Sequence, residues 1–137
     1  MYTISKEFHF SASHTLAHLP MTHPCSRTHG HNYIVIAEFN SNQLNHVGFV
    51  IDYRQLESIK EYINGKLDHQ DLNEVLDFNP TAENIAKYLF NAFRHTFPQL
   101  AAITVKETPK TAARYTPEND PHPDHITPPQ DESHPTD

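Results

Sequence analysis

Cysteine is almost missing from this sequence, and so are several features that would assign it to a particular class of protein. The single cysteine, Cys25, has no second cysteine for an internal disulfide. No segment approaches the roughly 18 consecutive apolar residues that a membrane span needs. The first residues, MYTISKEFHF, lack the cationic start and apolar stretch of a signal peptide. These absences favour a soluble, cytoplasmic protein.

An excess of positive charge is missing as well. The formal net charge is −7, and six of the acids lie after residue 116, where there is no lysine or arginine. Residues 1–116 carry eleven acids against ten bases. Such a balance offers neither the basic face that nucleic-acid binding requires nor a polybasic segment for anionic lipids. We therefore expect small-molecule or protein partners, with no nucleic acid and no membrane.

The length of 137 residues suits one hydrophobic core followed by an extension. From Pro117 onward, six of the eleven prolines gather with excess acid and almost no apolar residues. Such a segment cannot bury enough surface to offset its ordering entropy. We expect one catalytic domain over residues 1–116 and a disordered tail, rich in proline, histidine and acid, over residues 117–137. The tail histidines are interpreted as part of this low-complexity extension, without a metal-binding role.

Four stretches predict β-strands. Apolar and polar residues alternate over residues 2–10, and residues 31–39 place a second alternating set on one face. Residues 103–107 alternate in the same way, and residues 112–116 can return as a fourth strand beyond the turn at Pro109.

Two amphipathic helices are predicted between the second and third strands. Asp52 can cap the first, whose apolar residues recur at helical spacing until Gly65 ends it. Thr81 can cap the second, which runs to Phe97 and stops near Pro98. The order strand, strand, helix, helix, strand, strand predicts an α+β domain. Its sheet would be four-stranded and antiparallel, with both helices on one face.

A pair of histidines opens the second strand. Residues i and i+2 of a strand share a face, so His29 and His31 can point at one metal ion. His14 lies just past the first strand, where pairing of the two strands would bring it close. Three histidines and an open position are a common ligand set of catalytic zinc. Spacing alone leaves open that they are ordinary polar residues, because the chain has twelve histidines.

Cys25 and the Asp68–His69 pair add groups suited to proton transfer. Cys25 lies four residues before His29, and Asp68–His69 follows the first helix. A thiol and an acid-paired imidazole next to a metal site form a proton-transfer set. Spacing does not bring them together, however. Taken singly, Cys25 can be a quiet core residue and Asp68 a solubility charge at a helix end.

Six ordered segments of the chain form a recognisable set: FHFSASH (8–14), CSRTHGHNY (25–33), GFVIDY (48–53), LDH (67–69), NPTAEN (79–84) and VKET (105–108). Together they resemble the family of 6-pyruvoyl tetrahydropterin synthases and 6-carboxytetrahydropterin synthases. The resemblance covers most of residues 1–116 and none of the tail.

This resemblance implies the T-fold (tunnelling fold) and a role for each candidate residue. The zinc ligands would be His14, His29 and His31, the catalytic thiol Cys25, its proton-transfer partners Asp68 and His69, and the pterin-binding carboxylate Glu107. A carboxylate suits the last role because it can accept hydrogen bonds from the amino and ring N–H groups of a pterin. Outside this context Glu107 would be interpreted as an exposed strand carboxylate.

The spacing Cys25-x-x-x-His29 resembles the bacterial carboxy-forming members of the family. Their reaction converts 7,8-dihydroneopterin triphosphate to 6-carboxy-5,6,7,8-tetrahydropterin, acetaldehyde and triphosphate, a step towards queuosine and related deazapurines. Two alternatives stay open: a 6-pyruvoyl tetrahydropterin synthase, which eliminates triphosphate without cleaving the side chain, and a non-catalytic zinc- or pterin-binding protein. The resemblance also implies a homo-oligomer built from trimers, often a hexamer, with active sites between subunits.

Overall fold

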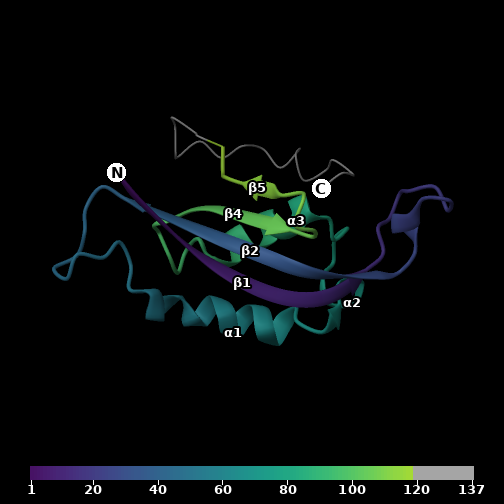
Figure 1. Ribbon diagram of the computed structural model, residues 1–137, viewed down its shortest axis with the longest axis horizontal. Coiled ribbons are helices and arrows are strands. Elements are labelled where there is room, and N and C mark those ends of the chain that lie inside the picture. The colour runs from purple at the N-terminus through teal and green to yellow at the C-terminus, as the bar shows by residue number, and fades with distance from the viewer. Residues whose placement is uncertain (119–137) are drawn as a thin grey trace.

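The computed structural model describes residues 1–118, which form one curved sheet with helices against it (Figure 1). Its two long strands, β1 (Tyr2–His14) and β2 (His29–Ser41), pair antiparallel over their whole length. β4 (Leu100–Lys106) pairs antiparallel with β2, and β5 (Ala113–Tyr115) pairs antiparallel with β4. The predicted α+β class is therefore confirmed. The extension predicted to be disordered lies, beyond residue 118, outside the described residues.

The sheet has one strand more than the sequence predicts. β3 (Gln70–Asp71) pairs parallel with β1 at Ala12 and Ser13, so the strand order is β3-β1-β2-β4-β5. The sheet is thus mixed, where a purely antiparallel one was predicted. Two residues are too few to show an alternating pattern. The pairing depends on the return of the chain after the first helix, where the His69 N–H donates to the Ser11 carbonyl at 2.6 Å.

The first predicted helix begins as a tighter turn. The Asp52 carboxylate caps a 3-10 helix, η2 (Tyr53–Leu56), by accepting from the N–H of Arg54 at 3.0 Å. η2 leads directly into α1 (Glu57–Lys66). The expectation that Gly65 ends this helix is wrong by a short margin, because α1 continues through it to Lys66. One glycine near a helix end costs only about 1 kcal/mol relative to alanine, so it does not by itself end the helix.

The second predicted helix begins at the predicted cap. Thr81 is the N-cap of α3 (Ala82–Phe93). The helix ends at Phe93, before the predicted end at Phe97. A further turn still buries Phe97, so the helical spacing of apolar residues continues past the end of the helix. A short helix that the sequence did not predict, α2 (Leu72–Val75), precedes α3 and is capped by Asp71.

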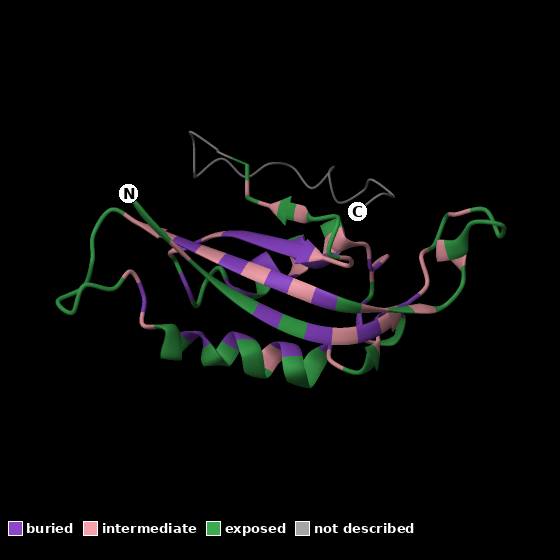
Figure 2. Cartoon of the chain, in the orientation of Figure 1, coloured by how far each residue is buried: buried purple, intermediate pink, exposed green. Residues whose placement is uncertain are grey.

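Both long helices cover the same face of the sheet, as predicted. α1 lies along β1, and α3 packs on β4 and β5 (Figure 1). Every second residue is buried over the second half of β1 and the middle of β2, and the residues between are exposed or intermediate (Figure 2), which is the pattern of a sheet with one covered face. The core between sheet and helices includes Tyr33, Val35, Ala37 and Phe39 of β2, Ile103 and Val105 of β4, Ile59 and Ile63 of α1, and Ile85 and Leu89 of α3.

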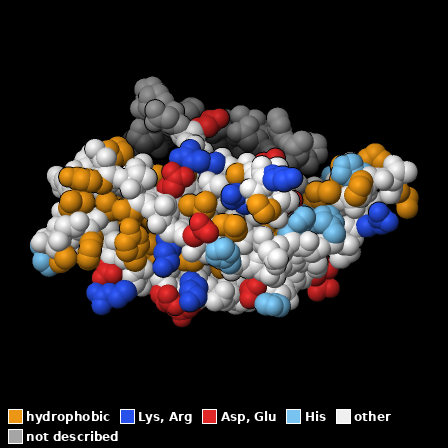
Figure 3. All heavy atoms as spheres, in the orientation of Figure 1, with side chains coloured by type: hydrophobic (Ala, Val, Ile, Leu, Met, Phe, Trp, Pro, Cys, Tyr) orange, Lys and Arg blue, Asp and Glu red, His pale blue; other side chains and the backbone are white. Residues whose placement is uncertain are grey.

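Exposed apolar side chains gather near the start of β1 and in the connection from β2 to α1 (Figure 3). They are Met1, Tyr2, Leu44, Val47, Phe49 and Tyr53. Several of them line an open hollow of about 420 Å³. None of the helices within residues 1–118 combines the length and apolar character of a membrane span.

Candidate active site

The three histidines predicted as metal ligands converge at one end of the two long strands. His14 ends β1, His29 begins β2, and the two are directly paired in the sheet. His31 follows on the same face of β2. One ring nitrogen from each histidine lies within 4.8 Å of those of the other two, and the Nε2 atoms of His14 and His29 are 3.0 Å apart. The register of the two strands therefore brings His14 to His29 and His31, which lie 15 and 17 positions further along the chain.

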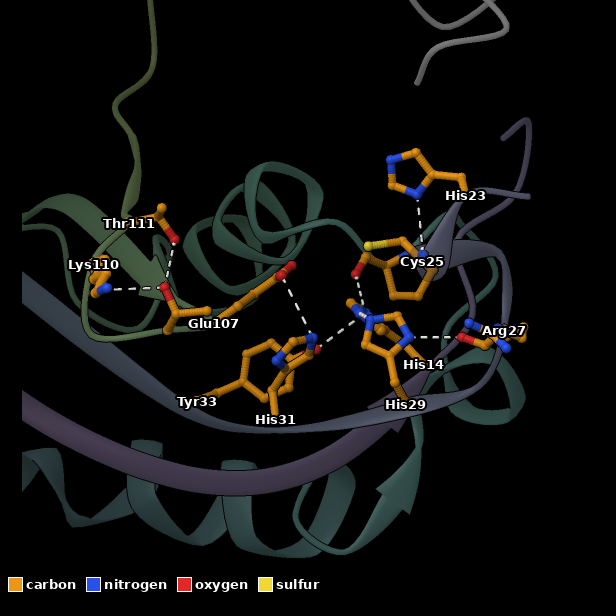
Figure 4. Close-up of polar contacts among 12 residues, drawn as sticks. His14, His23, Cys25, Arg27, His29, His31, Tyr33, Glu107, Lys110 and Thr111 are labelled. Carbon is orange, nitrogen blue, oxygen red and sulfur yellow. Dashed lines mark hydrogen bonds and ion pairs between the residues drawn. The ribbon is translucent and has the colours of Figure 1, made fainter. Parts of the chain in front are cut away.

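The outer nitrogens of two of these rings face backbone carbonyls (Figure 4). His14 Nδ1 lies 2.9 Å from the carbonyl oxygen of Pro80, and His29 Nδ1 lies 2.6 Å from that of Arg27. A carbonyl oxygen can only accept, so each Nδ1 carries the proton that it donates. Each Nε2 then directs a lone pair towards the centre of the cluster, as a metal ligand must.

The donor set fits a metal ion. His31 Nε2 is buried and has no hydrogen-bond partner in residues 1–118, the one such side-chain atom there. An unpaired buried nitrogen costs stability, whereas an ion at the centre of the cluster would satisfy it. The three rings are steeply inclined to one another, by 69°, 82° and 86°, so they converge without stacking. Burial lowers the pKa of His14, which favours the neutral form that binds metals.

Glu107 lies beside this cluster, just past the end of β4. Its Oε2 is 3.7 Å from His31 Nε2, and its side chain is largely shielded, with 22% exposed (Figure 4). Burial, and secondarily the charge of Glu107, raises the pKa of the neighbouring Tyr33 hydroxyl, which therefore stays protonated. The carboxylate is thus available at the mouth of the cluster for a ligand that donates hydrogen bonds.

Cys25 lies in a 3-10 turn, η1 (Pro24–Ser26), and is half-buried. The Leu16 N–H donates to the Cys25 carbonyl at 3.0 Å, and the Thr15 and Thr28 hydroxyls are 2.9 Å apart. These contacts close the neck of the connection between β1 and β2, which places Cys25 beside the histidines (Figure 4). The structure therefore brings together Cys25, Glu107 and the three histidines.

Asp68 and His69 form the predicted acid–imidazole pair at the outer edge of β1. His69 Nδ1 lies 2.8 Å from Asp68 Oδ2, and Asp68 Oδ1 accepts from the Ser11 N–H at 2.9 Å. The Ser11 N–H, together with His69, holds the pKa of the Asp68 carboxyl below its ordinary value. His69 has a φ of 60°, the left-handed region that is uncommon for residues other than glycine.

Within residues 1–118, this pair makes no hydrogen bond or ion pair with the histidine cluster. His69, whose side chain is 82% exposed, lines a hollow of about 430 Å³ together with Ser11, Ser13, Asn32 and His31. Successive strand residues point to opposite faces. Ser11 and Ser13 therefore face away from the covered side, to which His14 points. His69 thus lines a hollow on the face that Ser11 and Ser13 share, opposite the face to which the His14 side chain points.

The sequence did not reveal the groups behind the histidines. Tyr33 was predicted only as a strand residue, yet its hydroxyl lies 3.1 Å from His14 Nδ1. The spacing His31-x-Tyr33 was the available signal, because it places both on one face. The carbonyls of Pro80 and Arg27 have no sequence signal. Every residue has a backbone carbonyl, and only the conformation of the chain decides which one reaches a histidine.

A curved α+β sheet with three histidines converging beside a cysteine and a glutamate defines a class of small proteins equipped to hold a metal ion at a strand end. The chain belongs to the 6-pyruvoyl tetrahydropterin synthase family, whose model matches residues 3–118. The resemblance inferred from the sequence is thereby confirmed, and the chain is an enzyme of the tetrahydropterin synthase family.

Individual relatives agree with this assignment. A 6-carboxy-5,6,7,8-tetrahydropterin synthase of Bacillus subtilis is 30% identical over 129 residues, covering 85% of this chain and 86% of the relative. One from Synechocystis is 34% identical over 122 residues, covering 84% of this chain and 93% of the relative. The structure of 6-pyruvoyl tetrahydropterin synthase from Caenorhabditis elegans matches with a TM-score of 0.76 and 25% identity, over 85% of this chain and 96% of that one.

Proposed function

We propose that the chain is a zinc-dependent 6-carboxy-5,6,7,8-tetrahydropterin synthase, a lyase. It would convert 7,8-dihydroneopterin triphosphate and water to 6-carboxytetrahydropterin, acetaldehyde and triphosphate. The observation that carries the proposal is the convergence of three histidine nitrogens beside Cys25 and Glu107. Similarity to two relatives of that name, at 30% and 34% identity, selects this member of the family. A cytoplasmic location and a role in queuosine or deazapurine synthesis are proposed with it.

Each residue has a distinct task in this proposal. His14, His29 and His31 would hold zinc, which when bound supplies Lewis acidity to hydroxyl groups of the substrate side chain. Glu107 would accept hydrogen bonds from the amino and ring N–H groups of the pterin and so orient it. The Cys25 thiolate would accept a proton from carbon in the side chain.

We further propose that a neighbouring copy of the chain supplies the Asp68–His69 pair. Asp68 pairs with His69 Nδ1, and the His69 side chain is exposed. Its Nε2 would therefore be free to transfer a proton in the active site of a neighbouring copy. Within residues 1–118, the outer edge of β1 is paired only at Ala12 and Ser13, which leaves most of a long strand edge open. Open edges are commonly covered by association. A homo-oligomer built from trimers, up to a hexamer, is the proposed state.

Product analysis tests this function directly. The zinc-loaded protein would be incubated with 7,8-dihydroneopterin triphosphate, the pterins resolved by chromatography and mass spectrometry, and acetaldehyde assayed. Cys25→Ala is the inactive comparison, and its zinc content should equal that of the wild type. The proposal expects acetaldehyde and 6-carboxytetrahydropterin in equal amounts, both absent with the variant.

Other outcomes would assign the chain differently. A 6-pyruvoyl product without acetaldehyde would make it a 6-pyruvoyl tetrahydropterin synthase. Binding of zinc and substrate without turnover would leave a non-catalytic binding protein and refute the lyase.

A further inference from the structure

Two buried groups without a task in the proposed reaction contact His14 from behind. The His14 side chain is fully buried, and its Nδ1 lies 2.9 Å from the Pro80 carbonyl oxygen and 3.1 Å from the Tyr33 hydroxyl oxygen. Tyr33 is fully buried too, with its ring stacked on Phe10 at 4.6 Å between centroids. Neither group lies on the open side of the cluster, where a substrate would enter.

Proton counting shows what these two groups do. The Pro80 carbonyl has no hydrogen, so a short contact to it requires the proton on His14 Nδ1. The Tyr33 oxygen then approaches the same N–H as a second acceptor. Two acceptors behind the ring select one tautomer and restrict ring rotation. Acceptors of this kind behind ligand histidines commonly set the strength of a metal site.

Asn79, the residue before Pro80, is held in place by its neighbours on both sides. The side-chain amide of Asn84 donates to the Asn79 carbonyl at 2.9 Å, and the Thr81 N–H donates to the same oxygen at 2.8 Å. On the other side, the Ala17 N–H donates to the side chain of Asn79 at 2.9 Å. The segment that carries Pro80 is therefore anchored both to the start of α3 and to the connection after β1.

We propose that Tyr33 and Asn84 are positioning residues of the metal centre. Tyr33 acts directly through its hydroxyl, and Asn84 acts through the Pro80 carbonyl, so that His14 is held with Nε2 towards His29 and His31. The inference rests on the metal centre of the proposed function and adds to it two residues that touch neither the ion nor the substrate.

The experiment measures zinc affinity of Tyr33→Phe and Asn84→Ala by competition with a chromophoric chelator, starting from metal-free protein. Tyr33→Phe keeps the stacked ring and deletes one oxygen, while alanine at position 84 keeps α3 helical. The matched controls are Tyr62→Phe, which removes another hydroxyl bonded within the protein, to Tyr88, and Asn91→Ala on the same helix. The visible spectrum of the Co²⁺-substituted protein gives a second readout, which reports ligand geometry.

We expect both variants to bind zinc about 10- to 100-fold more weakly and to show an altered Co²⁺ spectrum. The controls should match the wild type in both. Urea unfolding of the metal-free proteins separates a loss of zinc affinity from a general loss of stability. If Tyr33→Phe folds poorly, the result for Asn84→Ala decides the test. Wild-type affinity in both variants would overturn this inference alone. A wild-type protein that holds no zinc would overturn the proposed metal centre, and the inference with it.

Discussion

The chemistry of each candidate residue follows from what lies around its side chain. His14 is enclosed between a carbonyl and a tyrosine, so burial keeps it neutral and ready to bind a metal. Glu107 stands at the mouth of the same cluster and remains partly open to a ligand. Asp68 is fixed by a backbone N–H and an imidazole, both of which favour its charged form.

Glu107→Gln should separate substrate binding from metal binding. The amide keeps the shape of the side chain but removes its charge and one of its two acceptors. Hydrogen bonds to charged groups contribute about 1.5 to 3 kcal/mol, so kcat/KM should fall roughly 10- to 100-fold. Zinc content should stay unchanged. Steady-state kinetics and metal analysis check both, with Glu57→Gln on exposed α1 as the control, and an unchanged kcat/KM would refute pterin binding by Glu107.

Asp68→Asn should reduce the acid sensitivity of the fold. The pKa of Asp68 is lower in the folded than in the unfolded chain. Its carboxylate therefore adds stability above the unfolded pKa of about 3.9, and this is lost as the pH falls through the folded value. The variant should be less stable than the wild type at pH 7, and the difference should shrink below about pH 4. Urea unfolding across this range checks it, and a difference independent of pH would contradict it.

At the scale of elements, the start of α3 serves both the helix and the site. The Thr81 hydroxyl accepts from the Asn84 N–H at 3.1 Å, while the preceding residue presents its carbonyl to His14. β1 and β2 also serve two purposes. Their inward residues build the core, except where β1 ends and β2 begins, where histidines replace apolar side chains. The site is thus the polar end of a packed sheet and helix layer.

Thr81→Ala should weaken this junction. Loss of an N-cap oxygen typically costs about 1 kcal/mol of the free energy of unfolding. Thr81→Ser keeps the oxygen and serves as the matched control, so it should stay within a few tenths of a kcal/mol of the wild type. Chemical denaturation of the metal-free protein measures both. Equal losses in the two variants would show that the hydroxyl is not the stabilising group.

At the scale of the whole molecule, the groups proposed for catalysis do not all lie together in the described residues. The histidine cluster and Cys25 lie on the covered side of the sheet, whereas His69 is exposed at the opposite side. An exposed apolar set, including Val47 and Phe49, lies at the far end of the long strands (Figure 3). An open strand edge and an uncovered apolar surface are both features that association with further copies would cover.

Mixing two inactive variants tests the division of the site between copies. Cys25→Ala and His69→Ala should each be inactive alone. If subunits assemble at random after joint refolding, about one site in four receives an intact Cys25 from one chain and an intact His69 from the other. Activity should therefore recover to roughly a quarter of the wild-type level. Refolded mixtures that stay as inactive as either variant would show that both groups act from one chain.

Local patterns were sufficient to predict most of the elements. Alternation indicated β1 and β2, and Asp52 and Thr81 marked the beginnings of the two helices, because these signals depend on residues close in sequence. The two-residue β3 was missed, since its existence depends on a backbone contact between residues 11 and 69. The adjacency of Asp68 and His69 was enough to predict their pairing, but not the face on which the pair would lie.

The α+β class, the shared face of His29 and His31 and the family can all be inferred from the amino-acid sequence, because periodicity and ordered motifs depend on residues close along the chain. Which groups meet depends on tertiary packing. The register of β1 against β2 sets His14 opposite His29, and the packing of α3 brings the Pro80 carbonyl to His14 across 66 residues. The return of the chain along β1 after α1 places His69 beside Ser11, where it makes no hydrogen bond or ion pair with the cluster within residues 1–118. Contacts between distant residues depend on how the elements pack, which no local pattern specifies.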